Sequence, residues 1–183
     1  MKLIPFFLMS GCALLAACGG AVQGGPAASA APAGRVVAPM RDAAGKDLGT
    51  LALTEAAQGI QVHGRLHGLE PGEHAIHLHA IGRCEAPGFT SAGGHWNPES
   101  RKHGAQNPEG PHMGDLPNIH VASDGTVEVN VVSPGGTLRG KDALLDADGA
   151  AVVVHAKADD YHTDPAGNAG DRIACGVVTA GAE

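Results

Sequence analysis

Residues 60–67 read Ile-Gln-Val-His-Gly-Arg-Leu-His and decide the kind of fold that this chain adopts. Apart from Gly64, apolar side chains occupy every second position and polar side chains the positions between them. One face of the segment is therefore apolar and the other polar. This period of two is typical of a β-strand that packs one face on a core and turns the other, with His63 and His67, towards solvent.

Similar short segments recur along the chain, and turn residues separate them. Turns are predicted at Glu70-Pro71-Gly72-Glu73 and at Ser123-Asp124-Gly125. No segment from residue 36 onward has the period of an amphipathic helix. Eight strands are predicted, over residues 36–41, 50–55, 60–67, 74–81, 118–122, 126–132, 151–155 and 173–179. The pattern predicts an all-β sandwich or barrel.

Two long segments, 82–117 and 156–172, interrupt the strands. They are rich in Gly, Pro and His, and they are too long for idle connections in a compact domain. Loops of this kind usually carry function. The few aromatic residues of this region, Phe89, Trp96 and Tyr161, all lie in these loops, so we expect an aliphatic interior.

The first 34 residues differ in composition from the rest. Residues 1–17 combine Lys2 with an apolar run too short to span a membrane, which is typical of a signal peptide. The run ends in Leu-Ala-Ala-Cys18, which resembles a bacterial lipobox, in which Cys18 would be lipidated; an ordinary secretory signal is the alternative. Residues 18–34 predict a flexible tether, and residues 35–183 the folded domain. We therefore expect the bacterial periplasm or cell envelope, with anchoring through Cys18.

The net charge argues against a nucleic-acid-binding protein, and the cysteine content allows a disulfide. The formal net charge is -7, and removing residues 1–17 takes away Lys2 and no acid, leaving -8. A basic surface for nucleic acid is thus not predicted. The folded region holds two cysteines, Cys84 and Cys175. In an oxidising compartment a disulfide is the default for such a pair, and two free thiols are the alternative.

Histidine is the residue type that points to chemistry. The chain has 11 histidines but only one tyrosine and one tryptophan. His77 and His79, two apart on a predicted strand, share one face; such a pair alone would more often be a polar strand surface. Further histidines and an aspartate follow in the first long loop, and imidazole suits copper and zinc while carboxylate completes a zinc shell. The spacing predicts a two-metal site formed by His77, His79, His95, His103, His112, Asp115 and His155.

Four stretches closely resemble copper,zinc superoxide dismutase in its bacterial exported form. They are GEHAIHLH at 72–79, SAGGHWNP at 91–98, HMGDLPN at 112–118 and GNAGDRIACG at 167–176. The resemblance covers nearly all of residues 36–179, with the motifs in the family's order. It implies an eight-stranded Greek-key flattened β-barrel, an immunoglobulin-like sandwich with two long functional loops. It also implies dismutation of superoxide to dioxygen and hydrogen peroxide, as antioxidant defence in the cell envelope.

The same resemblance implies a role for each site residue and one copper and one zinc ion per chain. The implied copper ligands are His77, His79, His95 and His155. The implied zinc ligands are His95, His103, His112 and Asp115. The imidazole of His95 would bridge both metals, since it has two ring nitrogens. Asp159 would accept hydrogen bonds from His77 and His103, Arg172 would attract the superoxide anion, and a Cys84–Cys175 disulfide would hold the metal loop.

Some residues fall outside this assignment. Five histidines match no ligand position, namely His63, His67, His74, His120 and His162. Residues 85–94 contain no basic residue, so the cations that could guide superoxide are Arg83, Arg101, Lys102, Lys157 and Arg172. The family occurs as monomers and homodimers, and both stay open. The alternative function is a non-catalytic module that binds or delivers copper or zinc, but such a domain would be expected to lose a copper ligand, the bridge or Arg172.

Overall fold

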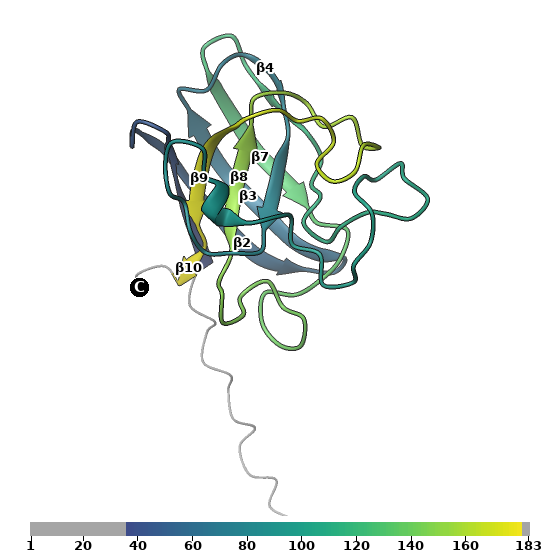
Figure 1. Ribbon diagram of the computed structural model, residues 1–183. Coiled ribbons are helices and arrows are strands. Elements are labelled where there is room, and N and C mark those ends of the chain that lie inside the picture. Colours follow the sequence, from purple (N-terminus) through teal and green to yellow (C-terminus); the bar gives the residue numbers. More distant parts are fainter. Residues whose placement is uncertain (1–35, 181–183) are drawn as a thin grey trace, which may run out of the picture. The chain divides into compact units, whose positions relative to one another are not determined.

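The computed structural model describes residues 36–180, so the predicted signal peptide and tether lie outside the described residues. Within the described range the only helical element is a 3-10 turn, η1 (Thr90–Ala92), and no helix has the length and apolarity of a membrane span. The rest is strand and loop (Figure 1). The strands are β1 (Val36–Asp42), β2 (Asp47–Ala56), β3 (Gly59–His67), β4 (Gly72–His74), β5 (Ile76–His79), β6 (Ile119–Val121), β7 (Thr126–Val132), β8 (Ala151–His155), β9 (Arg172–Val177) and β10 (Thr179–Ala180).

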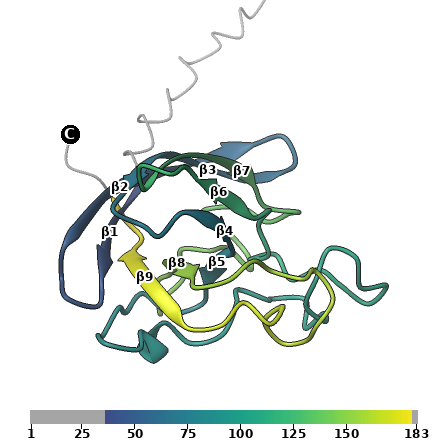
Figure 2. The same cartoon turned by 90° about the horizontal axis from the view of Figure 1, so that it is seen from above.

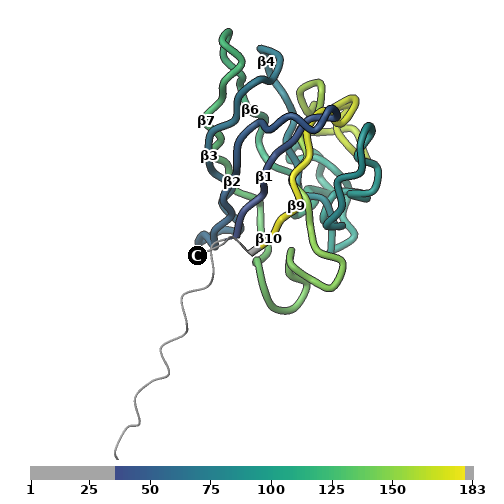
Figure 3. The backbone as a smooth tube through the Cα atoms, turned by 90° about the vertical axis from the view of Figure 1, so that its left-hand side faces the viewer, coloured from purple at the N-terminus to yellow at the C-terminus, as the bar shows by residue number. Residues whose placement is uncertain are grey.

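One curled antiparallel sheet carries most of the strands. Its order is β5-β8-β9-β1-β2-β3-β7, with β10 also paired to β1, while β4 and β6 form a separate two-stranded sheet. Figure 2 shows β1, β2, β3 and β7 in one layer and β5, β8 and β9 in the layer below. In Figure 3 the strands β7, β3, β2, β1 and β9 lie side by side, and the two long loops lie beyond β9, on the side of the molecule away from β7. The prediction of an all-β barrel-like sandwich is confirmed.

The core lies between the two layers and follows the predicted alternation. The register pairs Leu53 with Val62, and both side chains are buried. His67 is exposed as predicted, but His63 is half-buried, so the expectation that it faces solvent is wrong in part. His63 lies in register between residues of β2 and β7, and a central strand leaves less of a side chain exposed than an edge strand does.

Two of the predicted strands are divided in the structure. The segment predicted over 74–81 changes partner at Ala75, so that β4 pairs with β6 whereas β5 pairs with β8. Ala75 itself donates its N–H to Lys157 O (2.8 Å) and accepts from His155 N (2.9 Å). The segment predicted over 173–179 is divided into β9 and β10. The alternation alone did not predict these breaks, because they follow from which strands lie nearby.

The connections are more tightly packed than the sequence indicated. Trp96, from the first long loop, is 5% exposed and belongs to the main core, and Phe89 is 2% exposed in a second cluster with Cys175. The interior is therefore not purely aliphatic. A third long irregular segment, 133–150, joins β7 to β8; the predicted strands left it as a connection, but it was not singled out with the two long loops. It is held to the core through apolar side chains such as Leu144.

Candidate metal centre

Strand β5 places the first two histidines, and the loop that follows it returns along the free edge of the same strand. His77 and His79 are fully buried. Isolated bridges set Asp115 opposite His77 and His95 opposite His79. Residues separated by 16 to 38 positions in the chain are thereby brought to one strand edge. The geometry of sheet pairing, rather than helix periodicity, assembles this side of the site.

Backbone hydrogen bonds hold the returning loop against β5. Leu78 N donates to Gly114 O (2.9 Å), Trp96 N donates to Leu78 O (2.8 Å), and Gly114 N donates to Trp96 O (2.8 Å). Position 114 requires glycine, because a Cβ there would overlap the Leu78 carbonyl oxygen. The close approach lets the loop act as an additional strand that carries the side chains predicted to bind metal.

Strands β8 and β9 supply the opposite side. His155 is the last residue of β8, is 3% exposed, and lies opposite Arg172 at the start of β9. The register shifts between Val154 and His155. Such an irregularity can redirect a side chain, and here it accompanies the turn of His155 towards β5. The apolar β8 segment thus ends in a buried polar group.

Four histidines form what we call the four-histidine cluster: His77, His79, His95 and His155. Their potential ligand atoms lie within 4.8 Å of one another. Each ring has one buried nitrogen without a hydrogen-bond partner, Nδ1 in His77 and Nε2 in the other three. Leaving a buried polar atom unpaired costs about 1–3 kcal/mol, so four that converge indicate a site for a cation. The donor set of imidazole nitrogens fits copper.

In three of these rings the outer nitrogen faces a hydrogen-bond acceptor. His77 Nε2 donates to Asp159 Oδ2 (2.8 Å), and His79 Nδ1 donates to the Gly93 carbonyl (3.0 Å). His155 Nδ1 lies 3.3 Å from the Gly170 carbonyl. Each acceptor places the ring proton on the outer nitrogen and leaves the inner lone pair free for a metal.

A second set, the histidine–aspartate cluster, shares one ring with the first and consists of His95, His103, His112 and Asp115. Three Nδ1 atoms approach Asp115 Oδ1, at 2.9 Å from His95, 3.0 Å from His103 and 3.3 Å from His112. Ligand atoms around a tetrahedral zinc ion with bonds of about 2.0 Å lie about 3.3 Å apart. The cluster therefore has the spacing and the donor set of a zinc site.

Hydrogen bonds outside this second cluster orient its members. Asp115 Oδ2 accepts from the backbone N–H groups of Gly104 (2.9 Å) and His112 (3.0 Å), which leaves Oδ1 for the metal. His112 Nε2 donates to the Arg101 carbonyl (3.1 Å). Both contacts are local to the loop, so the loop conformation sets the ligand orientation.

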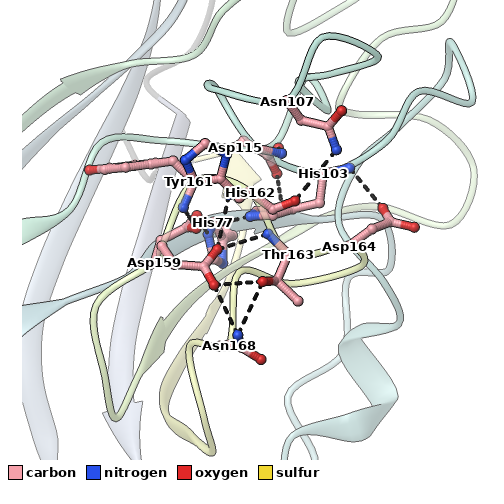
Figure 4. Close-up of polar contacts among 12 residues, drawn as sticks. His77, His103, Asn107, Asp115, Asp159, Tyr161, His162, Thr163, Asp164 and Asn168 are labelled. Atoms are coloured by element: carbon pink, nitrogen blue, oxygen red, sulfur yellow. Dashed lines mark hydrogen bonds and ion pairs between the residues drawn. The ribbon is translucent and has the colours of Figure 1, made fainter.

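Asp159 joins the two clusters, as Figure 4 shows. Its Oδ2 accepts from His77 Nε2, and its Oδ1 accepts from His103 Nε2 at 3.0 Å. Asp159 is 4% exposed, whereas the neighbouring Asp160 is exposed. Gly167, with φ 64°, lies over the carboxylate, where a Cβ would overlap Asp159 Oδ1. The carboxylate thus lies in a closed space and contacts one ring from each cluster.

Arg172 faces a cavity at the surface of the centre. Its guanidinium donates to the carbonyls of Phe89 (2.8 Å) and Gly93 (2.7 Å). The cavity has a volume of about 510 Å³. Charged and histidine side chains that line it are His95, His112, His155, Arg101, Asp164 and Arg172. Of the predicted guiding cations, Arg101 and Arg172 therefore line the cavity, while Lys102 pairs with Asp164 at 3.7 Å.

The histidines of the two clusters differ in the direction of their pKa shifts. Burial lowers the pKa of His79 well below its usual value, that of His95 to about 4 and that of His155 to about 3. These rings are neutral near pH 7 and can offer a lone pair. Burial also lowers the pKa of His103, but hydrogen bonds to Asp115 and Asp159 outweigh it and raise that pKa to about 9. In the absence of metal, the proton of this centre is therefore held at His103.

The disulfide prediction is confirmed, and some of the remaining histidines differ from expectation. Cys84 and Cys175 are joined, with their Cα atoms 5.7 Å apart. His120 and His162 are exposed, but His74 is buried, and its ring nitrogens lie 2.8 Å from the carbonyls of Glu70 and His155. The support that His74 gives to the backbone of a cluster residue was missed, because nothing in its spacing distinguishes it from a strand-face histidine.

Comparisons with known proteins cover most of the folded region. The family described as copper/zinc superoxide dismutase (SODC) matches residues 48–178. Superoxide dismutase (Cu-Zn) 1 of Aquifex aeolicus (strain VF5) is 47% identical over 137 residues, which cover 73% of this chain and 81% of that protein. A SOD-like protein from Bacillus subtilis has a TM-score of 0.75 and 39% identity over 78% of this chain and 97% of its own. Cu/Zn superoxide dismutase from Brucella abortus has a TM-score of 0.62 and 32% identity, over 78% of this chain and 98% of its own.

Proposed function

The chain belongs to the copper/zinc superoxide dismutase family, and we propose that its two clusters are the metal sites of this enzyme. The protein dismutates superoxide to dioxygen and hydrogen peroxide with copper and zinc as cofactors. We assign copper to the four-histidine cluster and zinc to the histidine–aspartate cluster. The observation that carries the copper assignment is the convergence of four buried ring nitrogens without partners.

When bound, copper supplies the alternating one-electron reduction and oxidation that dismutation needs, whereas zinc keeps its ligands in tetrahedral order without a redox step. His95 is the residue that both clusters share. Its Nδ1 lies 2.9 Å from Asp115 Oδ1, while its Nε2 belongs to the four-histidine cluster. His95 can therefore hold a proton at Nε2 beside the cavity and release it to the reduced substrate.

Arg172 provides the positive charge that binds the anion. Its guanidinium lies in the same cavity wall as His95 and His155. Two backbone carbonyls, those of Phe89 and Gly93, fix its orientation. Because the protein carries a formal net charge of -7, attraction of superoxide depends on this local field. We infer that Arg172 contributes mainly to substrate binding and less to the proton transfer.

Metal analysis combined with a superoxide assay tests this function. We expect about one copper and one zinc per chain, with rapid consumption of superoxide that stops when copper is removed. Uptake of both metals without consumption would instead favour the non-catalytic module that binds or delivers metal. Sedimentation of the same preparation would decide between a monomer and a homodimer.

The bridging role of His95 needs a test of its own. We expect His95→Ala to keep the fold and some copper, because His77, His79 and His155 remain. The variant should lose most of its zinc and most of its activity, since one ligand of the second cluster and the proton at Nε2 are gone. Undiminished dismutation by His95→Ala would contradict the assignment.

We further propose that the enzyme acts in the bacterial cell envelope as an antioxidant defence, anchored by a lipid on Cys18. The sequence of residues 1–18 supports this, and the relative from Aquifex aeolicus is bacterial. Fractionation of cells that express the full chain tests it. We expect the wild type in the membrane fraction and Cys18→Ser in the soluble periplasm; an unchanged distribution would exclude the anchor.

A further inference from the structure

Tyr161, which lies beside Asp159 in Figure 4, makes hydrogen bonds to three separate segments. Its backbone N–H donates to Asp159 Oδ1 at 2.7 Å, the oxygen that also accepts from His103. Its carbonyl accepts from Gln106 N at 3.0 Å. Its phenolic oxygen accepts from Asn118 N at 2.9 Å. One side chain and its peptide groups therefore contact the bridging carboxylate, the first long loop and the entry to β6.

Asn118 completes a closed ring of three residues. Its side chain pairs with both backbone groups of Asp159: Nδ2 donates to Asp159 O (3.0 Å), and Oδ1 accepts from Asp159 N (2.8 Å). Tyr161 in turn holds the backbone of Asn118 through its hydroxyl. The backbone of Asp159 is thus fixed on one side and its carboxylate on the other.

The backbone conformation of Tyr161 indicates that this hydrogen-bonded ring of three residues is under constraint. Its φ is 62°, in the left-handed region that a bulky aromatic residue rarely adopts. Such conformations persist where the surroundings determine them, and they concentrate at functional sites. The N–H of Tyr161 binds the carboxylate two residues earlier, as in an Asx-turn, and the positive φ directs the side chain and carbonyl of Tyr161 away from that turn to their own partners.

We propose that Tyr161 is a positioning residue for Asp159 and through it sets the orientation of His77 and His103. The inference rests on the proposed function, because those rings matter as metal ligands. Among the described residues, no hydrogen bond joins Tyr161 to an imidazole ring of either cluster, so its action is indirect. Loss of an outer partner of a metal ligand typically lowers affinity about 10- to 100-fold. Because the Tyr161 hydroxyl reaches Asp159 only through Asn118, two hydrogen bonds away, we expect a smaller effect of about threefold to tenfold.

The test compares Tyr161→Phe with the wild type as the full copper- and zinc-loaded chain. This substitution removes only the phenolic acceptor of Asn118 N. We expect zinc loss to excess chelator to be about threefold to tenfold faster. We also expect the ligand-field spectrum of cobalt(II) placed in the zinc site to shift, which a change in stability alone would not cause. Asn118→Asp, which loses the donor to Asp159 O, should act in the same direction.

Ser133→Ala is the matched control. Its hydroxyl also accepts from a backbone N–H, that of Ile60 (2.8 Å), but it makes no contact with Asp159. We expect this variant to melt at a lower temperature yet keep the wild-type rate of zinc loss and cobalt spectrum. We expect the double variant Tyr161→Phe/Asn118→Asp to accelerate zinc loss by less than the product of the single effects, since both act on one ring.

The outcomes separate this inference from the proposed function. Zinc loss from Tyr161→Phe at the wild-type rate, with an unshifted cobalt spectrum, would overturn the positioning role alone. An equal change in Ser133→Ala would overturn it too, because the effect would then be general destabilisation. A wild-type chain that takes up no zinc would overturn both the proposed function and this inference.

Discussion

Replacing Asp159 by asparagine should weaken copper binding more than zinc binding. The Oδ1 position receives two donors, the N–H of Tyr161 at 2.7 Å and Nε2 of His103 at 3.0 Å. The Oδ2 position receives one, Nε2 of His77 at 2.8 Å. An amide oxygen is the only acceptor of asparagine, so it should occupy the Oδ1 position. The amide NH₂ would then face His77, which needs an acceptor at that point.

The magnitude follows from the tautomer of His77. In the metal-free variant His77 can move its proton to Nδ1 and accept from the new amide at Nε2. Copper binding at Nδ1 forces the proton back to Nε2, opposite a donor. The side chain of His77 is 0% exposed, so no water can relieve this contact. A buried donor without an acceptor costs about 1–3 kcal/mol, which is about 5- to 150-fold in copper affinity.

Competition titrations of the variant with chelators for each metal provide the assay. We expect zinc affinity to fall by less than about fivefold, because His103 keeps its acceptor. Asp160→Asn is the matched control, since Asp160 is exposed and contacts His162, Thr163 and Asn168 but no cluster residue. A loss of zinc affinity larger than the loss of copper affinity would refute the assignment of oxygens at Asp159, and so would unchanged binding of both metals.

Three further predictions concern protons, the disulfide and salt. Because the pKa of His103 is raised from 6.5 to about 9, zinc binding between pH 7 and 8 should release about one proton and copper binding almost none, as calorimetry in two buffers would measure. The same raised pKa of His103 stabilises the metal-free fold fully below pH 6.5, and this contribution is lost as pH rises through about 9. At pH 10 His103 is neutral before zinc binds, so proton release on zinc binding that persists unchanged at pH 10 would contradict the raised pKa. Removing the disulfide with Cys84→Ser and Cys175→Ser opens a loop of 91 residues. The free energy of unfolding of the metal-free protein, measured in denaturant titrations, should fall by about 4–5 kcal/mol. A fall below about 1 kcal/mol would contradict the explanation by chain entropy. Superoxide consumption should fall less with added salt than in a relative guided by loop lysines, and a steep fall that Arg172→Gln leaves unaltered would show that another cation guides the substrate.

Much of the fold could be predicted from local pattern. The alternation in residues 60–67 and the turn residues around it predicted strands that the structure contains, because burial of one sheet face demands that period. The division at Ala75 was not predicted, since it depends on β6 and β8, which arrive from distant parts of the chain. Trp96 was placed in a loop, as predicted, but its burial follows from packing that no local window contains.

The candidate site, too, has residues that the sequence predicted and residues that it did not. Its ligand residues were predicted from residue type, spacing and family resemblance, because imidazole and carboxylate carry metal chemistry wherever they lie. The ring formed with Asp159 by Asn118 and Tyr161 was missed. Asn118 lies 41 residues before Asp159, and neither amide nor phenol is a residue type that signals a metal site. Only the observed hydrogen bonds identify these residues.

The sequence by itself determined that this chain forms strands around an apolar core and carries the side chains of a copper and zinc enzyme. The strands follow from the period of the residues, and the metal chemistry follows from their chemical groups together with the resemblance to the family. The tertiary structure alone decided which nitrogen each ring turns inward. That choice depends on acceptors such as Gly93 and Asp159, which reach His79 and His77 from other segments and fix the proton on the outer nitrogen. A neutral imidazole has one proton to place, so the position of its acceptor determines which lone pair remains for a metal.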